Sequence, residues 1–190
     1  FTEVFQKNSE RVERQKKAPL RVIMGNPPYS VGQKSANDNA QNQKYEKLDK
    51  RVSETYSQIS SAGLNRSQYD AYVKAFRWST DRLDPEYGGI IAFVSNGGWI
   101  DKNSFDGFRK ILEQEFSSVY VFDLRGDQRG DWRKEGGKIF GAGSKNKISI
   151  TILVKNPTKE PGEATIYYSN IGDYLKREEK LAIIKRFTSI

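Results

Sequence analysis

The sequence contains no cysteine and no histidine among its 190 residues. The absence of cysteine excludes disulfides and thiolate chemistry. The absence of histidine removes the commonest general base and the commonest metal ligand. Any catalysis by this chain must therefore rely on carboxylates, amides, tyrosines or a cofactor, and we expect no bound metal.

Long apolar segments are also missing. The mean hydropathy is −0.76 and hydrophobic residues make up 36% of the chain. No apolar run approaches the roughly 20 residues that cross a bilayer, and no secretory signal peptide opens the sequence. We therefore expect a cytoplasmic protein the size of one domain, with no membrane partner.

Acidic residues are outnumbered, with 24 Asp and Glu against 32 Lys and Arg and a formal net charge of +8. This excess favours a polyanionic partner, although it can also serve solubility alone. Many of the cations fall in a glycine-rich stretch, residues 125–147. This basic loop could contact DNA phosphates or could be a solvated surface loop, and both interpretations stay open.

Residues 20–25 form an apolar run that predicts a buried strand. The run stops at Asn26-Pro27-Pro28-Tyr29. The two prolines remove two backbone donors and hold φ near about −65°, and Pro27 disfavours a helical conformation at Asn26. The pattern predicts a stiff loop at the carboxyl end of a strand, where open α/β sheets bind their ligands. One amide, peptide carbonyls and an aromatic ring are suited to hold a flat heterocycle by an exocyclic amine.

Further apolar runs predict strands at 89–95, 118–124 and 148–155, with helices over 56–83 and 105–116. This alternation indicates an α/β fold with a parallel sheet and crossover helices. The basic loop has too little helical pattern for a crossover, so the fourth strand should be antiparallel to its neighbour. We also expect a short helix at 10–14, a short strand at 164–168, a final helix over 173–187, and a packing role for Trp99.

The polar residues 30–50 directly follow the proposed loop. They are interpreted either as a solvated surface loop or as a loop that becomes ordered when ligand binds.

The tetrapeptide Asn26-Pro27-Pro28-Tyr29 after a hydrophobic strand resembles motif IV of the amino-methyltransferases. Phe-Val-Ser-Asn-Gly-Gly-Trp at 93–99, Tyr-Val-Phe-Asp-Leu-Arg-Gly at 120–126 and Lys-Ile-Phe-Gly at 138–141 extend the likeness. This series is similar to the methyltransferase part of the large single-chain type ISP restriction–modification enzymes, often labelled predicted helicases. The resemblance covers about residues 10 to 187.

The resemblance implies a gamma-class DNA methyltransferase that transfers a methyl group from S-adenosyl-L-methionine to N6 of adenine. It implies that the Asn26 side-chain oxygen and the Pro27 carbonyl accept the amine hydrogens and border the cofactor. Tyr29 would stack on the base, and Pro28 would stiffen the loop. Because N6 lies on the base-pairing edge, the adenine must be flipped out of double-stranded DNA. Candidate DNA contacts are Tyr29, Lys34, Arg125, Arg129, Arg133 and Lys138.

The same resemblance suggests how the chain is divided. Residues 1–158 would be the catalytic half of a Rossmann-like methyltransferase sheet, with about four core strands, the last antiparallel. Residues 159–190 would be a linker and first element toward a target-recognition domain. No glycine-rich cofactor loop precedes residue 20, so we expect the cofactor-binding half and the helicase and nuclease regions elsewhere in the same polypeptide. The isolated chain should then be inactive and bind cofactor weakly.

Two other functions stay open at this point. Protein-glutamine and ribosomal RNA methyltransferases use the same tetrapeptide on other amino groups. A non-catalytic DNA-binding fragment is also compatible with a chain that lacks its cofactor loop.

Overall fold

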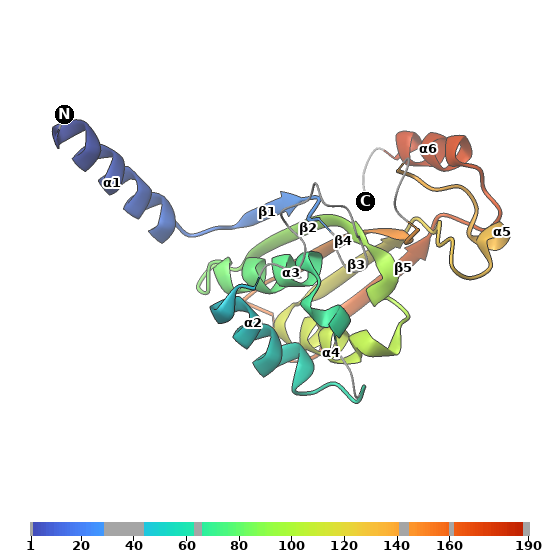
Figure 1. Ribbon diagram of the computed structural model, residues 1–190, viewed down its shortest axis with the longest axis horizontal. Helices are drawn as coiled ribbons and strands as arrows, with labels where there is room; N and C mark the ends of the chain where they lie inside the picture. The colour runs from blue at the N-terminus through green and yellow to red at the C-terminus, as the bar shows by residue number, and fades with distance from the viewer. Residues whose placement is uncertain (1, 29–43, 63–65, 141–144, 160–161, 188–190) are drawn as a thin grey trace.

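The computed structural model describes residues 2–28, 44–62, 66–140, 145–159 and 162–187. Its centre is a five-stranded sheet with the strand order β1-β2-β4-β3-β5 (Figure 1). The strands are β1 (Val22–Gly25), β2 (Gly89–Asn96), β3 (Ser118–Asp123), β4 (Ile148–Lys155) and β5 (Thr165–Asn170).

Strand direction follows the connections between the strands. β1 pairs with β2 and β3 pairs with β5 in parallel, whereas β4 is antiparallel to both of its neighbours. The α/β, Rossmann-like sheet and its antiparallel fourth strand are therefore confirmed. The short strand expected at 164–168 is also confirmed: it is β5, which joins the four core strands by pairing with β3. The division after residue 158 stays a prediction.

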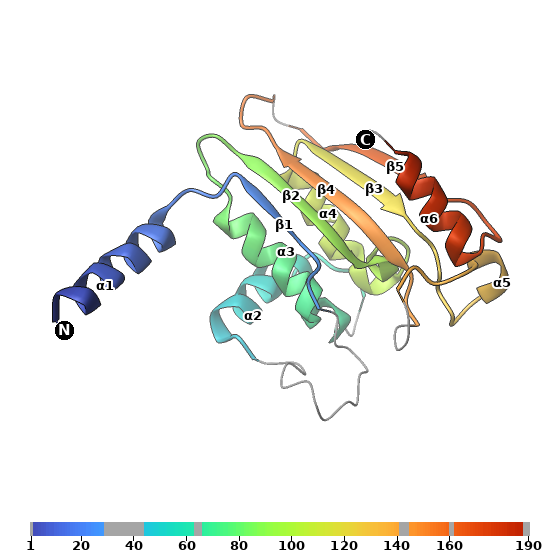
Figure 2. The ribbon, with the colours of Figure 1, turned by 90° about the horizontal axis from the view of Figure 1, so that it is seen from above.

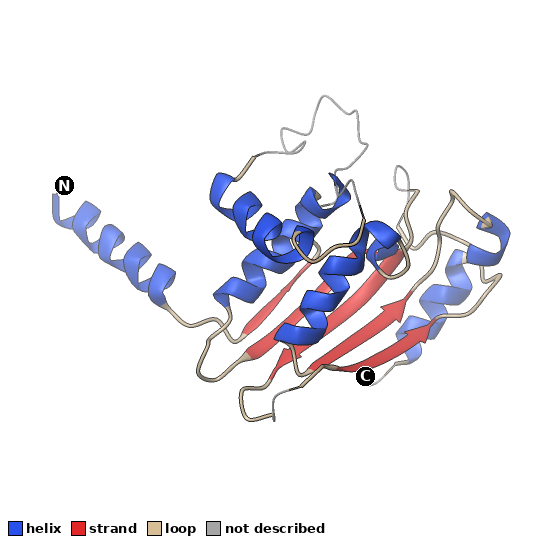
Figure 3. Ribbon diagram, turned by 90° about the horizontal axis from the view of Figure 1, so that it is seen from below, coloured by secondary structure: helices blue, strands red, loops and turns tan. Residues whose placement is uncertain are grey.

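Helices α3 (Ala71–Arg82) and α4 (Asp106–Glu115) cover one face of the sheet (Figures 2 and 3). Right-handed crossovers in one direction along a sheet place their helices on the same face. The core between these layers is aromatic, with the Phe108 ring 4.9 Å from Tyr56 and 5.4 Å from Phe76 and Trp99. Edge-to-face contacts of this kind add to the stabilisation from apolar burial.

The single helix expected over 56–83 is wrong. The structure has α2 (Glu46–Val52) with a π-helical turn at Ser53–Ser57, a 3₁₀ turn at Arg66–Tyr69, and then α3. Asp106 at the start of α4 explains the interruption: its carboxylate accepts from the Ser60 hydroxyl and, at 2.7 Å, from the Ser61 backbone N–H. These side-chain contacts compete with helical hydrogen bonds at this point of the chain.

The opposite face of the sheet is largely uncovered. Val22 is 58% exposed, Met24 74% and Ile90 38%, so the expectation that β1 is buried is wrong. β1 is an edge strand, and α3 and α4, which precede β2 and β3, lie on the other face. Parallel sheets normally have both faces covered, so an exposed apolar face of this kind is unusual.

The remaining helices lie outside this layer. α1 (Thr2–Lys17) is longer than the helix expected at 10–14 and projects away from the sheet in Figure 1. α5 (Trp132–Glu135) is a single turn in the basic loop, and α6 (Arg177–Arg186) falls within the expected final helix. α6 is fastened by the buried Lys180, whose ammonium donates to the Leu124 and Glu135 carbonyls at 2.9 and 2.8 Å. No helix in the described ranges is long and apolar enough to cross a membrane.

Candidate active site

The carboxyl ends of β1, β2, β3 and β5 meet at one edge of the sheet, because these four strands run in the same direction. Each of them ends at or just before a polar side chain, namely Asn26, Asn96, Asp123 and Asn170. Open α/β sheets bind ligands at this edge, so the structure brings the candidate loop to the expected place.

Asn26 follows β1 directly and is exposed, with no hydrogen bond from its side chain to any described residue. Pro27 is buried and anchors the loop, whereas Pro28 is exposed. Pro28 borders an open hollow of about 720 Å³ whose other walls come from α2, α3 and the residue before α2. Within the part of the chain that the structure describes, nothing occupies the amide oxygen of Asn26, and this exposed oxygen can accept a hydrogen bond from a ligand. Tyr29 and Lys34 lie outside the described residues.

The segment after β2 forms a tight turn beside this loop. The Asn96 side-chain oxygen accepts from the Gly98 N–H at 2.8 Å, and the Gly97 N–H donates to the Lys147 carbonyl at 2.8 Å. Trp99 is only 3% exposed, and its ring packs edge-to-face on Phe108. The packing role expected for Trp99 is confirmed.

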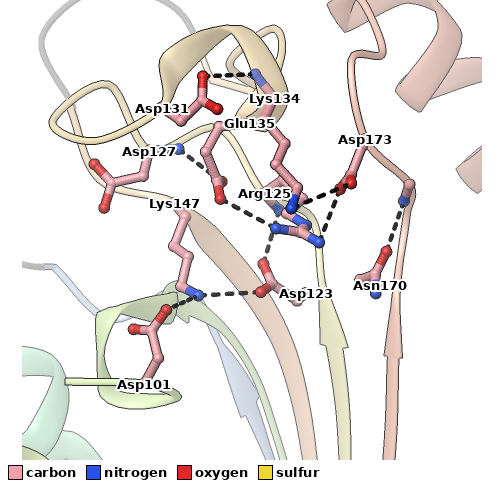
Figure 4. Close-up of polar contacts among 12 residues, drawn as sticks. Asp101, Asp123, Arg125, Asp127, Asp131, Lys134, Glu135, Lys147, Asn170 and Asp173 are labelled. Atoms are coloured by element: carbon pink, nitrogen blue, oxygen red, sulfur yellow. Dashed lines mark hydrogen bonds and ion pairs between the residues drawn. The ribbon is translucent and has the colours of Figure 1, made fainter. Parts of the chain in front are cut away.

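A network of ion pairs around the buried Lys147 and Asp123 lies in the middle of the same edge (Figure 4). The Lys147 ammonium is 2.8 Å from a carboxylate oxygen of Asp101 and 3.1 Å from one of Asp123. Burial disfavours the charged form of Lys147, but the two carboxylates outweigh it and raise the pKa of the ammonium above its ordinary value. Lys147 therefore stays charged at neutral pH.

The cations of the basic loop divide into paired and exposed groups. The Arg125 guanidinium lies 3.2 Å from Glu135 and 2.8 Å from Asp173. Arg129 and Arg133 are exposed, and Lys138 is half-buried. Figure 4 shows Arg125 facing these carboxylates inside the loop. Arg129 and Arg133 are thus accessible to a ligand at this edge, whereas Arg125 forms ion pairs within the protein.

Sequence reasoning missed the role of three residues at this edge. Lys147 was counted among the possible phosphate-binding cations, and Asp101 and Asp123 were not singled out. Their contacts span 46 and 24 positions of sequence. The position of Asp123 at the end of a predicted strand was the one available signal, since polar residues there face the ligand edge.

Among the described residues, no group of three or more acidic side chains is arranged to hold a metal ion. The exposed amide of Asn26 and the carbonyls of the proline loop are instead hydrogen-bond acceptors. Such a site suits recognition of an amino group, with a loop whose conformation is set before the ligand arrives.

The fold is that of an α/β protein with a Rossmann-like sheet, and the polar side chains at the carboxyl edge of the sheet form a candidate ligand site. No protein-family model matches the chain, and no curated protein sequence does. Among solved structures, the chain is similar to a nuclease-deletion mutant of the Type ISP restriction–modification enzyme LlaGI in complex with a DNA substrate mimic. The TM-score is 0.84, with 46% identity over 95% of this chain.

Two further structures agree with this likeness. The ATP-dependent Type ISP restriction–modification enzyme LlaBIII bound to DNA has a TM-score of 0.84 and 39% identity over 95% of this chain. DrdV, in a complex with DNA, has a TM-score of 0.81 and 38% identity over 95% of this chain. The chain spans 17% of the LlaGI chain, 12% of LlaBIII and 17% of DrdV. It is therefore similar to one segment of much longer chains.

Proposed function

We propose that this chain is the catalytic segment of a restriction–modification DNA methyltransferase. The reaction would transfer a methyl group from S-adenosyl-L-methionine to N6 of an adenine flipped out of double-stranded DNA. The observation that carries the proposal is the exposed side chain of Asn26, at the carboxyl end of β1 and immediately before two prolines. The likeness to LlaGI, LlaBIII and DrdV supports DNA as the substrate, because each of those proteins was solved with DNA or a DNA mimic.

The chemistry explains why an amide is placed here. The lone pair of the adenine amine is delocalised into the ring, so the amine is a weak nucleophile. Two acceptors aimed at its hydrogens, the Asn26 oxygen and the Pro27 carbonyl, favour the pyramidal nitrogen and stabilise the positive charge that develops on it. When bound, S-adenosyl-L-methionine would supply an electrophilic methyl group. The Asn26 oxygen and the Pro27 carbonyl would hold the amine during transfer, and the proton would pass from the nitrogen to water afterwards, so no histidine is needed.

The described residues supply only one wall for the cofactor. Asn26 and Pro27 fit a position beside it, since they lie at the ligand edge next to an unpaired strand edge. The exposed Val22 and Met24 on β1 support a further part of the same polypeptide against this strand. We propose that this part carries the main cofactor loop, with helicase and nuclease regions beyond it.

The surface next to the proposed DNA substrate is basic. Arg129 and Arg133 are exposed in the loop that leaves the carboxyl end of β3, at the same edge as Asn26. The neighbouring Trp132 is 57% exposed, with the Arg133 guanidinium 5.5 Å from its ring centre. We propose that these side chains contact the DNA backbone, whereas base recognition belongs to a separate domain.

The deciding experiment replaces Asn26 with alanine in the full-length protein and measures methyl transfer to adenine in duplex DNA. We expect the rate to fall by about 10²-fold or more, since loss of one positioned donor or acceptor at a developing charge costs on that order. Asn8→Ala, which changes an exposed asparagine on α1, should leave the rate unchanged.

The identity of the target is tested on the same protein. Nuclease digestion and mass spectrometry of the product should show N6-methyladenine, and a substrate with purine in place of the target adenine should accept no methyl group. Undiminished transfer by Asn26→Ala, or methylation of ribosomal RNA or protein in preference to DNA, would overturn the proposal.

A further inference from the structure

Lys147 occupies a central position at the carboxyl edge of the sheet. It directly precedes β4, between the ends of β2 and β3, and it is 5% exposed. Its ammonium connects two carboxylates from different elements, Asp101 after β2 and Asp123 at the end of β3 (Figure 4). Burying an ammonium costs several kcal/mol in general, so a fully paired one at a ligand edge calls for a physical explanation.

The Asp123 end of this bridge is fixed. Asp123 is 1% exposed, and besides Lys147 it accepts from the Arg125 backbone N–H at 2.8 Å and from the Tyr168 hydroxyl at 3.3 Å. Three donors from three parts of the chain therefore hold its carboxylate. The Asp123 carboxylate therefore fixes the position of the ammonium of Lys147, the residue that directly precedes β4.

The Asp101 end belongs to the segment 97–101, which follows β2. The side chain of Asp101 is 63% exposed, so Lys147 is its anchor to the protein. The same residue holds the segment a second time, because the Gly97 N–H donates to the Lys147 carbonyl. A side chain at Gly97 would come within 3.2 Å of the Lys147 stem. Backbone, stem and ammonium of one lysine thus set the course of this segment.

The segment 97–101 borders the candidate site. β1 and β2 are neighbours in parallel register, with Gly25 opposite Phe93. β2 continues for three residues beyond that pair, to Asn96. The segment therefore leaves the sheet next to the loop that begins at Asn26. Asn26 and the segment 97–101 thus leave adjacent parallel strands at the same edge of the sheet.

We propose that Lys147 is a positioning residue for methyl transfer: anchored on Asp123, it holds Asp101 and the segment 97–101 as a wall beside Asn26. This inference rests on the proposed function. It assigns no proton transfer to Lys147, whose role is to keep the target amine in line with the acceptors. Small displacements at such a wall have large effects on rate, because the reacting atoms must be aligned.

Asp101 is the best residue for a test, since it is exposed and its replacement does not leave a charge buried without a partner. Asp123 still pairs with Lys147 when Asp101 is changed. In the full-length protein, we expect Asp101→Asn to lower the single-turnover rate of methyl transfer about tenfold. The KM for DNA should stay within about twofold of the value for the unchanged protein. The melting temperature should stay within about one degree of it.

Rescue and control variants separate positioning from a general effect of charge. Asp101→Glu keeps the carboxylate at an exposed position and should restore most of the rate. Glu54→Gln removes an exposed carboxylate that pairs with Lys50 at 3.6 Å on α2 and its π turn, and it should change nothing.

Two results would overturn the inference. The first is an unchanged rate for Asp101→Asn alongside loss of transfer by Asn26→Ala, which would leave Lys147 with a purely structural role. The second is a higher KM at an unchanged rate, which would make Asp101 a DNA-binding group instead. If Asn26→Ala also retains full transfer, it is the proposed function that fails.

Discussion

At the carboxyl end of β1, the exposed residue Asn26 directly precedes two prolines. Pro27 is buried and Pro28 is exposed beside the hollow, so the first anchors the loop and the second faces solvent. Proline at both positions restricts φ before any ligand binds. The loop backbone is thereby restricted in advance, which reduces the conformational entropy that is lost when a ligand binds.

The two acceptors of the proposed site, the Asn26 side-chain oxygen and the Pro27 carbonyl, can be tested separately by mutation. Pro27→Ala keeps the backbone carbonyl but loses the restriction on φ, so the full-length variant should retain transfer at about one tenth of the original rate. Asn26→Ala should lose at least about another tenfold. Single-turnover methylation measures both, with the exposed Pro157 changed to alanine at the opposite edge as the control. If Pro27→Ala and Asn26→Ala lowered the methylation rate equally, the rate would depend on the loop conformation alone.

At the scale of elements, the basic loop between β3 and β4 has two parts. Arg125, near β3, is held in ion pairs, whereas the tip of the loop, with Arg129 and Arg133, is exposed. Arg125 pairs with Glu135 inside the loop and with Asp173, which follows β5. Lys180 holds α6 against the loop by donating to the Leu124 and Glu135 carbonyls. Arg129 and Arg133 are left on the surface near α5. Only cations that are free to release counterions contribute to salt-dependent DNA affinity.

The double variant Arg129→Ala, Arg133→Ala should therefore weaken DNA binding equally for all sequences. The slope of log affinity against log salt should fall by about two, close to one for each phosphate that is no longer neutralised. Fluorescence anisotropy of the full-length protein at several salt concentrations measures this slope. Lys110→Ala changes an exposed cation on α4 and should leave the slope unchanged. An unchanged slope in the double variant would remove the tip from the DNA interface.

At the scale of the whole molecule, the sheet is covered by helices on one face and is open on most of the other. Exposed apolar side chains continue from Val22 and Met24 on β1 to Tyr167 on β5. An apolar hollow of about 590 Å³ lies beside Phe187 and the rings of Tyr120 and Tyr167, which stack 4.6 Å apart. A surface of this kind indicates contact with other protein.

The open edge leads to a prediction about the cofactor. Titration calorimetry of the 190-residue chain with S-adenosyl-L-methionine should give no saturable heat, because Asn26 and Pro27 form only one wall of the proposed site. The full-length protein should bind one equivalent. Tight, stoichiometric binding by the 190-residue chain would show that the described residues already complete the cofactor site.

The positions of the strands were determined by the sequence itself. The apolar runs at 89–95, 118–124 and 148–155 correspond to β2, β3 and β4 within a residue or two, because strand formation follows from local side-chain shape and alternation. The direction of β4 was also predictable, since the preceding loop has too little helical pattern for a parallel crossover. The end of β1 before Asn26 was also predictable, because two adjacent prolines restrict the backbone locally.

Tertiary structure decided what depends on distant partners. β1 is exposed although its residues are apolar, because burial is a property of the whole sheet and not of one strand. The helix expected over 56–83 is interrupted because Ser60 and Ser61 meet Asp106, 46 and 45 residues away. In the sequence, Lys147 is one more cation of the basic loop. Only the meeting of β2, β3 and β4 at one edge places it between Asp101 and Asp123, where Coulomb attraction in a buried setting fixes its role.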